Sequence, residues 1–206
     1  MSRPTPPVPE LLVPRLRETD RLVALPRLLL RDARTGGGPR LPTSLRMGLR
    51  GNTLCVRFDG KDAGVVASYT RRDDPLWEED VFEVFLAAGE DPPLVYFEFE
   101  INPLGALFDA RIQSPEGRRS SMRTQTEWDC LGFTARVAQK GGSWSASVRI
   151  PLESLAPGPL PRVWRANFFR IDRGTVDEFS AWSPPLTDPA DFHVPERFGI
   201  LRLDFP

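Results

Sequence analysis

Short runs that alternate aromatic or β-branched residues with polar ones recur along this chain and constrain its fold more than any other feature. Residues 80–87 (DVFEVFLA) and 94–101 (LVYFEFEI) show the pattern most clearly. Alternation with a period of two is typical of a strand with two different faces. Turn clusters such as NPLG and QKGG separate the runs. The other runs of this kind are residues 53–58, 107–112, 132–138, 143–150, 162–171 and 198–205.

About ten short strands with almost no helix predict an all-β fold, a mainly antiparallel β-sandwich of two sheets. Residues 151–155 (PLESL) predict a short helical turn, because proline is favoured at the first position of a helix. A length of 206 residues fits one such domain. Residues 1–18 are rich in proline and lack periodicity, so we expect a flexible N-terminal arm and a single domain over residues 19–206.

The charge balance and the apolar runs argue against several classes of partner. The chain has 27 basic and 28 acidic residues, so it lacks the overall basic field that holds nucleic acid. No apolar run approaches the length of a membrane span. Prolines and a glutamate occupy the start, where a signal peptide needs an apolar stretch, which predicts a cytoplasmic protein, or a secreted or periplasmic one if a leader was removed. Cys55 and Cys130 permit one disulfide at most and have no metal-like spacing.

Alternation also assigns side chains to the two faces of the predicted sheets. Residues 80–87, 94–101 and 107–112 are joined by short turns, so we expect them to pair as neighbours. Their polar positions would share one face, either a solvated outer surface or the polar part of a polyol site, which needs acids and amide or guanidinium donors. This polar face comprises Glu83, Glu98, Glu100, Asn102, Asp109 and Arg111. We expect burial between the sheets for Phe82, Val84, Phe97, Phe99, Phe108, Ile112, Trp144, Val148, Trp164 and Phe168.

The five tryptophans fall into two groups. Trp144 and Trp164 lie inside strand patterns and are expected in the core, and Trp128 lies at a junction between loop and strand. Trp77 and Trp182 lie in loop sequences, RDDPLWEED and FSAWSPPLTDP, which fit either lids over the core or platforms for a ligand. A pyranose ring has an apolar C–H face that an indole can cover, and its hydroxyls suit carboxylate and amide partners. Two such tryptophans with Glu, Asn and Arg therefore indicate sugar binding.

Five motifs occur in a fixed order, namely LWEEDVFEVFL, YFEFEINPLGALFDAR, WRANFFRID, FSAWSP and FHVPERFG. In this order they resemble the family 9 carbohydrate-binding modules over roughly residues 20–206. The resemblance implies a DOMON-like sandwich, an immunoglobulin-like jelly roll, with a non-catalytic sugar-binding function. It also implies that Trp77 and Trp182 hold the sugar between them, with Glu83 as the binding carboxylate and Asn102 as the binding amide.

The chain departs from the pattern of the family at one position. Modules of the family have a sequence like arginine-valine-asparagine at the positions where this chain has Glu100, Ile101 and Asn102. We expect Arg111 on the next strand to supply the hydrogen-bond donors that the arginine of the family provides. The expected ligand is a mono- or oligosaccharide, and no cofactor is required. The resemblance also implies an optional structural calcium ion, for which residues 71–75 (RRDDP) offer oxygen ligands. It further implies a glycan-processing enzyme as a partner, since such modules are usually appended to glycoside hydrolases.

Three alternatives remain open at this point. A protein-interaction or sensor domain would keep the fold without the sugar. A haem domain would need axial ligands, for which the chain offers His193 with Met47 or Met122. A glycosidase needs an opposed pair of carboxylates, whereas Glu78 and Glu79 are consecutive and point to opposite faces if the chain is extended there.

Overall fold

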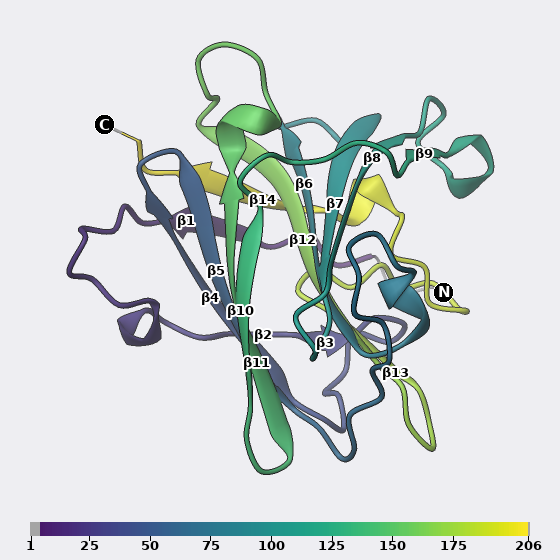
Figure 1. Cartoon of the computed structure of the whole chain (residues 1–206). Coiled ribbons are helices and arrows are strands. Elements are labelled where there is room, and N and C mark those ends of the chain that lie inside the picture. The colour runs from purple at the N-terminus through teal and green to yellow at the C-terminus, as the bar shows by residue number, and fades with distance from the viewer. Residues whose placement is uncertain (1–4, 206) are drawn as a thin grey trace.

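A computed structural model describes residues 5–205 as two packed β-sheets (Figure 1). Apart from the parallel β1–β14 pair, the paired strands run antiparallel. The nine-stranded sheet has the order β1-β14-β12-β6-β7-β8-β9, with β13 paired to β12 and β3, and the five-stranded sheet has the order β10-β11-β5-β4-β2. The predicted all-β, mainly antiparallel sandwich is confirmed.

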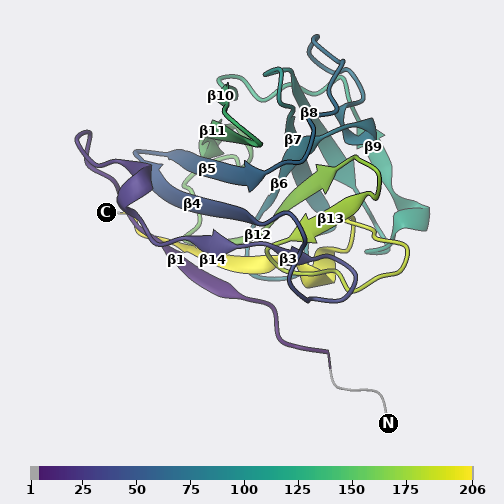
Figure 2. The ribbon, with the colours of Figure 1, turned by 90° about the horizontal axis from the view of Figure 1, so that it is seen from below.

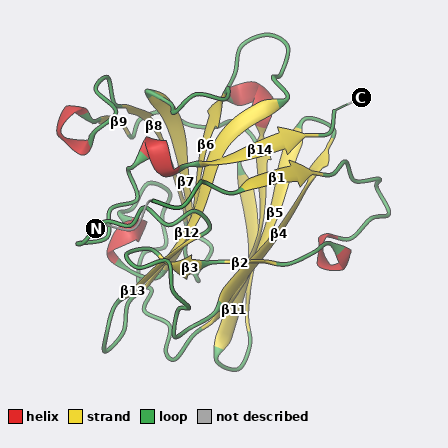
Figure 3. Cartoon of the chain, turned by 180° about the vertical axis from the view of Figure 1, so that it is seen from behind, coloured by secondary structure: helices red, strands yellow, loops and turns green. Residues whose placement is uncertain are grey.

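The strands of the nine-stranded sheet are β1 (Glu10–Val13), β3 (Arg31–Asp32), β6 (Val81–Ala88), β7 (Val95–Ile101), β8 (Leu107–Gln113), β9 (Arg123–Gln125), β12 (Val163–Asp172), β13 (Glu178–Ala181) and β14 (Gly199–Leu203). Those of the five-stranded sheet are β2 (Leu28–Leu29), β4 (Thr43–Arg50), β5 (Thr53–Lys61), β10 (Thr134–Gln139) and β11 (Ser143–Pro151). The helical segments are single 3₁₀ turns, shown in red in Figure 3, namely η1 (Leu22–Ala24), η2 (Leu76–Glu78), η3 (Arg119–Ser121), η4 (Leu152–Ser154) and η5 (Pro195–Arg197). The predicted helical turn at residues 151–155 is confirmed as η4. No helix within residues 5–205 is long and apolar enough to cross a membrane.

Large aromatic side chains fill the space between the two sheets. Phe82 of β6 stacks on Phe58 of β5 with ring centroids 4.7 Å apart, and on Trp144 of β11 at 3.8 Å. Trp164 and Phe168 of β12 are fully buried in the same cluster. Full burial of side chains of this size contributes roughly 2–3 kcal/mol each, so this layer carries much of the stability.

A second apolar cluster lies on the other face of the nine-stranded sheet, beneath loops. Phe108 and Ile112 of β8 belong to it, so their predicted position between the sheets is wrong although both are buried. The register explains the difference, because Phe108 lies opposite Glu100 of β7 and Asp109 lies opposite Phe99. Directly opposed residues in an antiparallel pair share a face. The nine-stranded sheet is therefore covered on both faces, and its outer face is not a solvated one.

Much of the predicted N-terminal arm is built into the fold. Residues 10–13 form β1, which lies beside β14 in Figure 2 and pairs in parallel register with residues 200–203. Leu16 packs against Gly48 of β4, where an added Cβ would lie 2.7 Å from the leucine side chain. The expectation of a flexible arm is thus corrected for residues 10–16, while residues 1–4 lie outside the described residues.

Candidate functional site

A cavity of about 570 Å³ lies on the outer face of the nine-stranded sheet. Its size falls in the usual range for small-molecule sites. Side chains of β6, β7, β8 and β12 form its floor, and η2, η3, β9, β13 and the loop 189–193 form its walls. The lining residues are Trp77, Glu83, Glu98, Phe108, Arg119, Met122, Thr124, Ile171, Arg173, Phe179, Pro189, Ala190, Asp191, Phe192 and His193.

Two glutamates, Glu83 and Glu98, line the floor of this cavity, and a third, Glu100, is buried close to them. Glu83 of β6 lies directly opposite Glu100 of β7 in the register, and Glu98 is the next residue of β7 on the same face. Their exposed fractions are 2%, 0% and 6% in the order Glu83, Glu100 and Glu98, and one carboxylate oxygen from each lies within 4.8 Å of the other two. Neither oxygen of Glu100 has a hydrogen-bond partner within residues 5–205.

Burial dominates the electrostatics of these three acids, which we call the glutamate cluster. Burial raises the pKa of Glu98 to about 7. Burial followed by the charge of Glu98 raises the pKa of Glu83 well above its ordinary value, and burial followed by the charges of Glu83 and Glu98 does the same for Glu100. A carboxyl that keeps its proton near neutral pH can donate a hydrogen bond, whereas an ionised one only accepts. The floor can therefore offer both donors and acceptors to a polar ligand.

Aromatic side chains stand beside the glutamate cluster. Trp77 of η2 is 41% exposed and rests on the edge of Phe108 at 5.1 Å between centroids, so much of its indole remains available to a ligand. Phe179 of β13 and Phe192 form another wall, with centroids 6.1 Å apart, and Phe192 stacks on the buried Phe169 at 4.1 Å. These contacts fix the rings, so a stacking ligand would find them already ordered.

Two arginines hold the walls in place. Arg119 of η3 donates to Asp191 at 2.9 Å and thereby joins two lining segments that are far apart in the sequence. Arg173, which follows β12, donates to the backbone oxygen of Trp77 at 3.0 Å, and its guanidinium lies 5.2 Å from the ring centroid of Phe179. Both guanidiniums line the cavity, so they also place N–H donors near a bound polar group.

The two predicted tryptophan platforms do not lie together. Trp77 lines the cavity as expected, whereas Trp182 is 8% exposed and belongs to the core between the sheets. Its backbone N–H bonds to the oxygen of Phe168, and its indole packs on Phe168 at 5.7 Å and against Gly199. The prediction that Trp77 and Trp182 face each other is wrong. Phe179, three residues earlier, is the side chain of this segment that reaches the cavity.

The other predicted ligands divide in the same way. Glu83 opens into the cavity as expected, and Glu98, which the sequence placed on the same face without a site role, lies beside it. Asn102 is fully buried, and its amide bonds to the oxygen of Tyr69 and to two backbone N–H groups of its own turn, so it holds loops and does not line the cavity. Arg111 lies opposite Phe97 on the other face of the sheet and donates to Gln125 at 2.8 Å. The expected placement of Asn102 and Arg111 in the site is therefore corrected.

The residues available for haem do not fit an axial pair. His193 and Met122 both line the cavity, but both contact the hydroxyl of Tyr96, His193 through Nδ1 at 2.9 Å and Met122 through its sulfur at 3.8 Å. Axial ligands must approach the iron from opposite sides of the porphyrin. Because His193 and Met122 both contact the same phenol oxygen, no room for a porphyrin is left between them. Burial also lowers the pKa of His193 to about 4, so this histidine is neutral at ordinary pH.

Among residues 5–205, three groups of acids have oxygens close enough to hold a metal ion. In the group of Asp62, Asp80 and Asp172, Arg170 already contacts two of the carboxylates. In the group of Asp73, Asp109 and Asp129, Arg72 forms an ion pair with Asp109. The glutamate cluster has no such ion pair within residues 5–205, so its oxygens are the ones left for a hard cation. The expected calcium ion stays a prediction, and residues 71–75 supply only Asp73 to any of these groups.

Comparisons with known proteins agree with this architecture. Residues 40–203 match the sequence profile of the family described as carbohydrate-binding family 9. A family 9 carbohydrate-binding module from Caldicellulosiruptor kristjanssonii has been solved in complex with glucose and with cellotriose. Each of these structures superimposes with a TM-score of 0.65 at 13% identity, over 96% of this chain and 96% or 94% of the module.

Two further relatives extend the comparison. A Bacteroides uniformis protein that is proposed to bind carbohydrate superimposes with a TM-score of 0.77 at 20% identity, over 95% of this chain and 99% of that one. A protein of Arthroderma benhamiae named as an extracellular protein is 28% identical over 170 residues, which are 76% of each chain. The structures share the fold, and the profile match covers most of the chain. This chain belongs to carbohydrate-binding family 9, a family of non-catalytic carbohydrate-binding modules.

Proposed function

We propose that the cavity on the nine-stranded sheet holds one neutral sugar ring, with the indole of Trp77 as the stacking face. The observation that carries the proposal is the position of an exposed indole beside buried carboxyls in a single cavity. A sugar ring has the matching pair of surfaces, an apolar C–H face and a belt of hydroxyls. The C. kristjanssonii module was solved with glucose and with cellotriose, so glucose and its β-linked oligomers are the first ligands to test.

In this proposal the walls and the floor of the cavity contact different parts of the sugar. Trp77 covers one face of the ring, and Phe179 and Phe192 limit the opposite side. Glu83 and Glu98 bond to hydroxyls from the floor. A buried carboxyl that is partly protonated suits a hydroxyl, because a hydroxyl both donates and accepts. The site therefore uses one tryptophan with phenylalanines, in place of two tryptophans.

Isothermal titration calorimetry with glucose and cellotriose tests the proposal. We expect dissociation constants in the micromolar to millimolar range, about 4–8 kcal/mol, because a small ligand makes few contacts that are each partly offset by lost hydration. Trp77→Ala should weaken binding at least tenfold, and Glu83→Leu should act similarly because it removes both hydrogen-bonding oxygens from the floor. Leu131→Ala and Glu127→Leu are matched controls, since both side chains are exposed and neither lines the cavity.

The controls should bind as the wild type does, and Trp77→Ala and both controls should retain the melting temperature within a few degrees. If the folded wild type binds no sugar from a panel that includes xylo-, cello- and chito-oligosaccharides, the proposal fails. An interaction or sensor domain that kept the fold would then be the better interpretation. If binding occurs but Trp77→Ala leaves it unchanged, the sugar lies elsewhere.

A further inference from the structure

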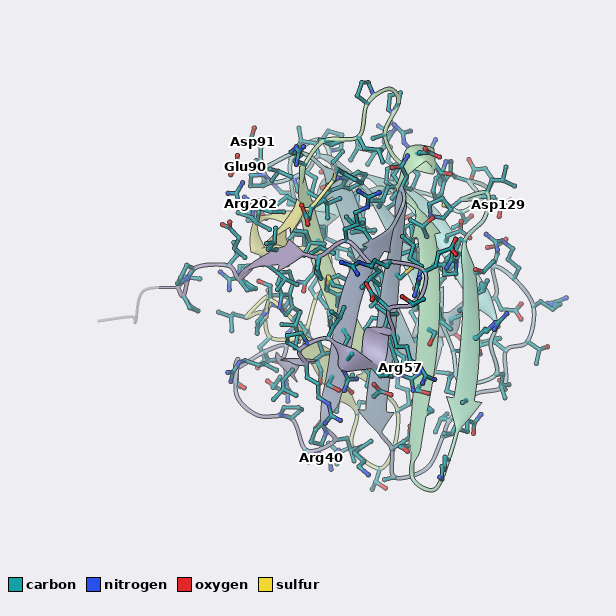
Figure 4. All side chains as sticks on the ribbon, turned by 90° about the vertical axis from the view of Figure 1, so that its left-hand side faces the viewer. Arg40, Arg57, Glu90, Asp91, Asp129 and Arg202 are labelled. Atoms are coloured by element: carbon teal, nitrogen blue, oxygen red, sulfur yellow. The ribbon has the colours of Figure 1, made fainter. Side chains whose placement is uncertain are left out.

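The outer face of the five-stranded sheet carries a row of basic side chains. The register aligns Arg136 of β10, Ser147 of β11, Arg57 of β5 and Arg46 of β4 across four neighbouring strands. Their inward neighbours, such as Val56, lie in the core, so the row itself points away from the other sheet. Figure 4 views the molecule from this side, with Arg57 labelled near the middle of the strands.

This face is hollowed by a groove of about 740 Å³. One wall comes from the N-terminal segment through Val23, Arg27 and Leu29, and the floor comes from β4, β5, β10 and β11. We call it the basic groove, because its charged lining residues are Arg27, Arg46, Arg57, Lys61, Lys140 and a single acid, Asp59, within the described part of the chain. Arg149 and Arg136 add two exposed cations to the same sheet face.

The single acid of the groove orders two of the cations without cancelling the charge. Asp59 accepts from Arg46 at 2.8 Å and from Arg57 at 3.0 and 2.8 Å, and Arg57 also donates to Ser147 at 3.2 Å. One carboxylate thus holds two guanidiniums, which leaves a net positive charge at a fixed place. Side chains held in this way lose little further entropy when they bind an anion.

The remaining cations at the groove have no acidic partner. Arg27, Lys61, Arg136 and Lys140 are exposed and make no ion pair within residues 5–205. Because the whole chain has a net charge of −1, this excess of positive charge is a local feature that the overall composition conceals. Cations concentrated around one groove raise the local concentration of polyanions and speed their association.

We infer that the basic groove is a second glycan site, which binds an acidic polysaccharide through carboxylate or sulfate groups. Serine hydroxyls lie between the cations, at Ser44, Ser143 and Ser145, and they suit the neutral hydroxyls of such a chain. Single-stranded nucleic acid needs aromatic faces for its bases. The aromatic residue of the groove, Trp144, is 1% exposed, so the lining offers no such platform within the described residues. The groove lies on the opposite sheet from the sugar cavity, so the two sites are separate.

Affinity measurements with defined polymers test this inference. The probes are polygalacturonate for carboxylate groups, dextran sulfate for sulfate groups and neutral dextran as the uncharged comparison. We expect at least one polyanion to bind more tightly than dextran, whose neutral glucose rings can use only the sugar cavity. The logarithm of the binding constant should fall linearly with the logarithm of the salt concentration, because binding releases counterions. The triple variant Lys61→Gln, Arg136→Gln, Lys140→Gln should weaken binding at least tenfold and reduce the salt dependence.

A charge-matched variant separates the groove from net charge. Arg34→Gln, Arg118→Gln, Arg123→Gln removes the same number of exposed cations from the side of the nine-stranded sheet and should bind polyanions as the wild type does. Equal losses in the two triple variants would overturn the inference, and so would equal binding of dextran. Tighter binding of a single-stranded oligonucleotide than of either polysaccharide would assign the groove to nucleic acid. Cellotriose binding by the groove variant should be unchanged, which keeps this result independent of the cavity.

Discussion

Glu100→Gln should stabilise this protein at alkaline pH, although it alters a fully buried side chain. The glutamine has nearly the same shape, but it cannot ionise, and its amide can donate to Glu83 or Glu98. In the wild type, the pKa of Glu98 rises from 4.5 to about 7, which corresponds to about 3 kcal/mol at 1.36 kcal/mol per pKa unit. The pKa of Glu100 is raised in the same direction, by burial and then by the charges of Glu83 and Glu98, so ionisation of Glu100 also destabilises the folded state.

The direction in which stability changes with pH follows from the number of protons bound by the folded and unfolded protein. Between pH 4.5 and about 7 the folded protein keeps the Glu98 proton that the unfolded chain has already released. The contribution of Glu98 to the free energy of unfolding therefore falls as the pH rises through this window and levels off above it. Glu100→Gln removes one of the titrating groups, so its gain in stability over the wild type should grow as the pH rises from 4.5 to 8.

Urea denaturation of both proteins at several pH values measures this difference. EDTA belongs in every buffer, so that no divalent cation neutralises the glutamate cluster in the wild type. A gain for Glu100→Gln that grows from pH 4.5 to pH 8 supports the assignment of three mutually repelling buried acids. A loss of stability that grows from pH 4.5 to pH 8 would refute the reasoning, because it would mean that the Glu100 carboxylate makes favourable interactions in its ionised form.

Three further outcomes follow from packing and pairing. Trp182→Ala should lower the free energy of unfolding by about 3–5 kcal/mol in urea, since Trp182 fills the core. Arg170→Met should cost about 3–5 kcal/mol by the same measurement, because it leaves two buried aspartates without their base; a neutral or stabilising effect would mean that these acids are protonated. Cys55 and Cys130 are both free and buried, so a thiol reagent should label two thiols after unfolding without reductant and react slowly with the native protein; a single fast thiol would contradict this.

Period-two alternation predicted most of the long strands, but it could not fix the register between them. It correctly separated Phe97 and Phe99 from Glu98 and Glu100 within β7. It failed for β8, because both faces of the nine-stranded sheet are buried, and a rule of apolar inside and polar outside cannot then choose between them. A shift of one residue moves every side chain of a strand to the other face. The one-residue difference in the register of β8 explains why the sequence predicts Arg111 in the site, whereas the side chain lies on the opposite face of the sheet.

The residues that form the walls of the cavity could not be predicted from local sequence either. Alternation along residues 179–182 places Phe179 and Trp182 on opposite faces, but it does not tell which of the two faces the cavity lies on. Residues 119–124 and 189–193 reach the cavity through long-range contacts such as Arg119 with Asp191, for which local sequence gives no sign. β4 was also missed, because its outward positions include Arg46 and Gly48 and it has no aromatic residue.

The resonances of the five indole N–H groups test the central proposal most directly, namely that a neutral sugar stacks on Trp77 alone among the tryptophans. The spectrum of the ¹⁵N-labelled protein is recorded during a cellotriose titration, and the Trp77 signal is assigned with Trp77→Phe. We predict that the Trp77 signal shifts with saturation while the signals of Trp144, Trp164 and Trp182 stay in place, because those three indoles are buried between the sheets. A titration that moves the Trp182 signal and leaves that of Trp77 unchanged would contradict the proposed site.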